Sequence, residues 1–76
     1  MKKSAVAKRS IVIDGHKTSI SLEEEFWDSF KSIAEFKGIF LSTLASHIDA
    51  ERNKSNLSSQ IRLYVLLHYK GRAQHV

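Results

Sequence analysis

The stretch from His16 to Leu22 constrains the fold most, because its side chains alternate in character. One row is apolar or β-branched, and the other holds one cation and two hydroxyls. The first row comprises Thr18, Ile20 and Leu22, and the second row comprises Lys17, Ser19 and Ser21. A period of two predicts a strand with one face in a core. The polar row has no carboxylate and suits base edges in a major groove, which admits a two-stranded ribbon. A strand that merely faces solvent would show the same pattern.

A turn signal precedes this strand. Ser10–Ile13 is a short β-branched run, and Asp14-Gly15 separates it from His16. Asp-Gly between two such runs favours a type I′ turn, which needs a positive φ at both central residues. Arg9–Ile13 therefore either folds back on His16–Ser21, or the second strand pairs with that of another copy of the chain. The local sequence is compatible with both arrangements.

An amphipathic helix is predicted next. Ser21 and Glu24 have the spacing of a capping box, although Leu22 is an alternative last residue of the strand. Apolar residues then recur at helical spacing on one side of the predicted helix. They are Phe26, Trp27, Phe30, Ile33 and Ala34. Gly38 is expected to end the helix in the left-handed conformation.

Two further helices are expected after a turn at Ile39-Phe40. The first carries its apolar stripe on Leu41, Leu44, Ala45 and Ile48. The second begins near Leu57, with Asn56 or Ser58 as its N-cap, and continues to Tyr69. Leu63, Leu66 and Leu67 extend its apolar character almost around the axis, which predicts burial on several sides. We expect this helix to be an intersubunit element.

The size of the chain points to a partner subunit as well. A chain of 76 residues forms at most one domain, with a marginal core. It contains no cysteine, which excludes disulfides and the usual cysteine-based zinc sites. Oligomerisation is the remaining way to stabilise so small a fold. A hydrophobic content of 42% is too high for a disordered chain.

The positive charge is concentrated near the N-terminus. The net charge is +4, and the first twenty residues carry all of the excess. Their charged residues are Lys2, Lys3, Lys8, Arg9 and Lys17 against Asp14 alone. A basic arm on a neutral body favours a polyanionic partner, although a solubilising tail has the same composition.

Other functional classes find little support. The basic start has no apolar run behind it, so we expect no signal peptide, no membrane span and a cytoplasmic protein. The histidines are scattered, and neither His68 nor His75 has a carboxylate at helical spacing, so we expect no metal site and no cofactor. The acidic run at residues 23–25 suits the positive end of a helix better than acid–base catalysis. We therefore do not expect an enzyme.

One strand, a helix ended by Gly38, a tight turn and a second helix resemble the ribbon-helix-helix DNA-binding fold. The resemblance is closest to a branch of predicted DNA-binding proteins with an additional C-terminal helix. The segments that carry it are Gly15–Glu23, Phe26-Trp27, Ile48–Arg52 and Asn56–Ser59. The implied organisation is a flexible basic arm at 1–8, the domain at 9–70 and a frayed C-terminus at 71–76.

The resemblance implies a mostly α fold with a short β-ribbon, in which two chains form an intertwined homodimer. It implies a sequence-specific protein that binds double-stranded DNA, a transcriptional regulator, with the ribbon in the major groove. The implied base-reading residues are Lys17, Ser19 and Ser21. The expected phosphate contacts are Arg9, Lys2, Lys3, and Leu41 and Ser42 at a helix N-terminus. The implied dimer core comprises Ile20, Leu22, Phe26, Phe30, Leu44 and Ile48.

Two points leave room for another function. The family often has Ser or Thr before the second helix, whereas Phe40 stands here, and the missing side-chain cap costs about 1 kcal/mol. Either the phosphate contact is weaker, or Phe40 contacts another partner. The alternative to autonomous DNA binding is an antitoxin-like or adaptor protein that binds a protein partner through Leu57–Tyr69.

Overall fold

The computed structural model describes residues 5–51 and 56–73 of the chain. Strand β1 (Val6–Ile13) and strand β2 (His16–Glu23) precede helices α1 (Glu24–Lys37), α2 (Leu41–Glu51) and α3 (Leu57–Ala73). The predicted order of elements is thus confirmed. Strand β1 begins before Arg9 and α3 extends past Tyr69, while the proposed domain boundaries stay predictions. Lys2 and Lys3 lie outside the described residues.

The two strands form one antiparallel ribbon within a single chain. Asp14 and Gly15 have φ angles of 51° and 80°, the two positive values that a type I′ turn requires. The turn places Ile13 opposite His16, and the register continues to Val6 opposite Glu23. Of the two pairings that the sequence allows, the structure therefore has the intrachain hairpin.

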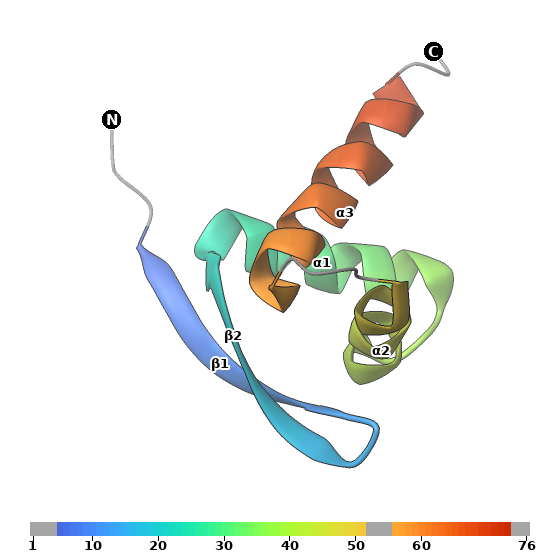
Figure 1. The fold of residues 1–76 in the computed structure, drawn as a ribbon. Helices are drawn as coiled ribbons and strands as arrows, with labels where there is room; N and C mark the ends of the chain where they lie inside the picture. Colours follow the sequence, from blue (N-terminus) through green and yellow to red (C-terminus); the bar gives the residue numbers. More distant parts are fainter. Residues whose placement is uncertain (1–4, 52–55, 74–76) are drawn as a thin grey trace.

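The three helices cover one face of this ribbon (Figure 1). Side chains from all five elements form a single core beneath it. The largest fully buried ones are Trp27, Phe30, Ile20, Leu22, Ile33 and Ile61. Helix α3 contributes Leu57, Ile61 and Val65, so it closes the core from the side opposite the hairpin turn.

The residues expected in a dimer core lie in the core of one chain. Ile20, Leu22, Phe30, Leu44 and Ile48 are each at most 3% exposed, and Phe26 is half-buried. A single chain buries these side chains without a partner because all three helices pack against one face of the ribbon. Any role of these residues in a dimer remains a proposal.

The helix boundaries agree with the sequence signals except at the start of α1. Gly38 has a φ of 69° and donates its N–H to the carbonyl of Glu35, as a left-handed cap does. Asn56 caps α3, since its Oδ1 accepts the N–H of Ser59 at 2.8 Å. The predicted capping box at Ser21 and Glu24 is wrong, because Glu23 is the N-cap and makes no side-chain cap hydrogen bond.

The strand continues past Ser21 for a tertiary reason. Leu22 is fully buried, and the backbone N–H of Ser21 donates to Ser58 Oγ of α3 at 3.0 Å. These two contacts hold the segment extended, so α1 begins only at Glu24. No helix of the described part is both long and apolar enough to cross a membrane.

Candidate nucleic-acid interface

The face of the ribbon turned away from the helices is the candidate interface. Successive side chains of a strand point to opposite faces, so alternate residues form this outward face. Its central residues are Lys8, Ser10 and Val12 of β1 and Lys17, Ser19 and Ser21 of β2. The register places Lys8 beside Ser21, Ser10 beside Ser19 and Val12 beside Lys17. All are exposed except Ser21, which is half-buried.

The predicted reading residues therefore lie together on one surface. Lys17, Ser19 and Ser21 form one row of it, as the alternation in β2 predicts. The sequence analysis missed Lys8 and Ser10, which form the neighbouring row. The Asp14-Gly15 turn contains the signal that could have identified them, because a two-residue loop fixes which residues of β1 stand opposite each residue of β2.

Within the described ribbon, the only carboxylate on the outward face is at its far end, and it is paired. Glu23 Oε1 accepts a hydrogen bond from Arg62 Nε at 2.9 Å. This hydrogen bond from the guanidinium lowers the pKa of Glu23. The negative charge of Glu23 is thus matched by α3, and the two lysines, Lys8 and Lys17, dominate the rest of the described outward face.

Arg9, a predicted phosphate contact, lies on the inner face of the ribbon. Its register partner is the buried Ile20, and its Nη2 forms an ion pair with Glu24 Oε1 at 3.0 Å. Its guanidinium also lies 4.9 Å from the centre of the Trp27 ring. Arg9 therefore anchors β1 to α1 in this structure.

The first turn of α2 lies beside the turn end of the ribbon. Ser46 Oγ donates to Asp14 Oδ1 at 2.9 Å, which attaches the helix to the hairpin turn. Ser42 and Val12 both line a hollow of about 400 Å³ at this junction. Ser42 is exposed and Leu41 is half-buried, so the free N–H groups of this helix start can be reached from the edge of the ribbon. The carboxylate of Asp14 lines the same hollow.

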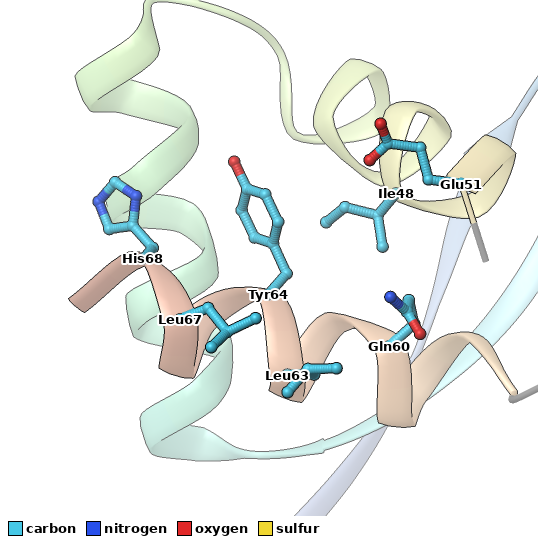
Figure 2. A pocket seen from close by; sticks show the side chains of 7 residues that line it. All are labelled: Ile48, Glu51, Gln60, Leu63, Tyr64, Leu67 and His68. Atoms are coloured by element: carbon cyan, nitrogen blue, oxygen red, sulfur yellow. The ribbon is translucent and has the colours of Figure 1, made fainter. Parts of the chain in front are cut away.

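A second surface feature lies on α3. Leu63, Leu66 and Leu67 have i, i+3 and i+4 spacing and are each about half exposed, at 46%, 52% and 56%. We call these three residues the leucine stripe. Two of them border a cavity of about 360 Å³ between α2 and α3 (Figure 2). The cavity is lined by Ile48, Glu51, Gln60, Leu63, Tyr64, Leu67 and His68.

Comparison with known proteins assigns the family. A model of the ribbon-helix-helix domain matches residues 6–69. The chain belongs to the ribbon-helix-helix domain family. Proteins of this family generally bind DNA. The described residues include no group of three or more histidines, cysteines or carboxylates that could hold a metal ion.

A solved structure shares the architecture. An uncharacterized protein from Bordetella pertussis Tohama I is 27% identical in sequence and superposes with a TM-score of 0.80. The match covers 95% of this chain and 62% of that one, so the present chain spans less than two thirds of that protein. Among curated proteins, none matches significantly.

Proposed function

We propose that this protein is a sequence-specific double-stranded DNA-binding protein, a cytoplasmic transcriptional regulator that acts as a homodimer without catalysis or a cofactor. The observation that carries the proposal is the outward face of the ribbon, where Lys17, Ser19 and Ser21 form a row free of unpaired carboxylate. A two-stranded ribbon fits a major groove, where lysine can donate to guanine and serine can contact several bases.

The phosphate contacts belong to the same proposal. Ser42 lines the same hollow as Val12 of the ribbon, so the N–H groups at Leu41 and Ser42 would bind the backbone that flanks an occupied groove. Lys2 and Lys3 would add contacts that do not depend on base sequence. Arg9 would have to exchange its ion pair with Glu24 for a phosphate, so we expect it to contribute less than these groups.

The homodimer would form through α3. The leucine stripe is about half exposed, and such a stripe on a helix normally packs against another helix. A second copy of the chain is the occupant that we propose, because ribbon-helix-helix proteins generally bind DNA as dimers. The same stripe favours the second candidate function, an antitoxin-like or adaptor protein whose α3 binds a different protein.

Replacing Lys17 tests base reading. Lys17→Ala should weaken binding to a preferred site by roughly 1–3 kcal/mol and should relax the base preference at that position. The matched control is Lys31→Ala on α1, which removes the same charge from an exposed side chain outside the ribbon. Competition binding with selected and scrambled duplexes measures both effects. If the Lys17→Ala variant has the same affinity and base preference as the Lys31→Ala variant, the proposed reading face is refuted.

The mass of the purified chain in solution separates the two candidate functions. A stable dimer that Leu66→Ala dissociates, with no other protein present, supports the autonomous regulator. A monomer that binds no duplex at low salt supports the adaptor instead.

A further inference from the structure

Strand β2 makes contacts on both of its edges within one chain, along its full length on one edge and at Ser21 on the other. Strand β1 pairs along one edge over its full length. On the other edge, the N–H of Ser21 donates to Ser58 Oγ at 3.0 Å, and its carbonyl accepts from Arg62 Nη2 at 3.1 Å. The N–H and C=O of one residue in an antiparallel strand point to the same edge, so α3 lies where a further strand would have to pair. A partner's β2 could pair with β2 at Ser21 only by displacing β1 or α3.

Strand β1 is also firmly attached to its own chain. The type I′ turn connects the strands by two residues that both have positive φ angles. At the far end, Trp27 Nε1 donates to the carbonyl of Ala7 at 3.1 Å. Ile13 is buried in the core. Exchange of β1 with a partner would re-form these contacts between chains, but it would straighten the Asp14-Gly15 turn, whose sequence favours the hairpin.

From this arrangement we infer that each chain carries a complete reading ribbon, in which Lys8 and Ser10 contact base edges beside Lys17, Ser19 and Ser21. The inference rests on the proposed function and deepens it. Lys8 and Ser10 are exposed and point outward from the same ribbon face. Val12 is 55% exposed on that face and can contact a thymine methyl group.

A ribbon of this kind selects a different class of DNA sequence. Two identical strands from two chains are related by a two-fold axis, so they read a palindromic centre. Here the two rows differ, with Lys8, Ser10 and Val12 opposite Ser21, Ser19 and Lys17. One ribbon therefore reads an asymmetric element. A dimer would read two copies of that element at a separation set by its α3 contact.

A disulfide scan tests whether the ribbon is intrachain without using DNA. The chain contains no cysteine. The N–H of Ser21 points away from β1, so Lys8 and Ser21 form a non-hydrogen-bonded pair of the ribbon. Ser10 and Ser19, two positions along, form a pair of the same type. The Cα atoms of such pairs are about 4.5 Å apart, which is within the range of a disulfide. Oxidised S10C/S19C should run as a monomer on a denaturing gel without reductant. The single S19C variant, the control, should stay uncrosslinked. Covalent dimers of either variant would overturn the intrachain ribbon.

Site selection with wild type, Lys8→Ala and the control Lys31→Ala tests the reading role. We expect wild type to select asymmetric elements, and Lys8→Ala to lose about tenfold in affinity for them with a changed base preference. A palindromic element without a spacer would overturn the inference. A Lys8→Ala variant whose affinity falls by the same factor for all sequences would also overturn the inference, because Lys8 would then contact phosphate only. A wild type that binds no duplex would overturn the proposed function itself, whatever the disulfide result.

Discussion

Replacing Ile61 by alanine tests whether α3 belongs to the core of the single chain. The Ile61 side chain is 0% exposed and lies in the same cluster as Ile20, Leu22 and Phe30. Truncating a buried isoleucine costs about 2–5 kcal/mol, from lost burial and the cavity left behind. A domain of 76 residues has a free energy of unfolding of roughly 4–11 kcal/mol by the usual per-residue range. Ile61→Ala should thus lower the melting temperature by about 8 °C or more.

Leu66→Ala is the matched control on the same helix. Leu66 is 52% exposed on the far side of α3, so its truncation should change the intrinsic stability of the chain by about 0.5 kcal/mol or less. If the leucine stripe pairs two chains, this variant should instead lose the rise in stability with protein concentration. Urea unfolding at several concentrations measures both quantities. An Ile61→Ala variant as stable as wild type at every concentration would refute the role of α3 in the core.

Three further substitutions test local features. Gly38→Ala should destabilise the chain by about 1–2 kcal/mol in thermal unfolding, because its φ of 69° is costly for alanine although no atom lies within 4 Å of the added Cβ. Trp27→Phe should cost about 1 kcal/mol in urea unfolding, since the carbonyl of Ala7 loses its indole donor. The pKa of Glu23 lies below its ordinary value of 4.5 because of Arg62. The stability from this pair is therefore present above the ordinary pKa and lost as pH falls through the lowered one, and Glu23→Gln should flatten that acid-side loss in unfolding midpoints.

Much of the fold could be predicted from local signals. The alternation of residues 17–22 identifies the buried and exposed faces of β2, and Asp14-Gly15 identifies the turn. Gly38 and Asn56 mark a helix end and a helix start correctly. Such features depend on backbone conformation over a few residues, which is why sequence alone determines them.

The remainder depends on contacts between distant residues. Ser21 has capping-box spacing, yet Ser58, 37 positions later, holds it in the strand. The surroundings of the ribbon likewise depend on distant residues, because Arg62 of α3 donates to the carbonyl of Ser21 and the Trp27 indole donates to the carbonyl of Ala7. Lys8 was expected in the arm because the β-branched run begins only after it. Its place on the outward face follows from the register of β1, which starts at Val6.

Binding of the purified chain to random duplex DNA across a salt series, with its mass recorded alongside, measures whether the folded protein binds DNA and in which oligomeric state. We predict a dimer whose log affinity falls linearly with log salt concentration, because lysines of the ribbon and the N-terminal residues release counterions from phosphates. A folded chain with no detectable duplex binding at low salt would refute DNA binding by the ribbon.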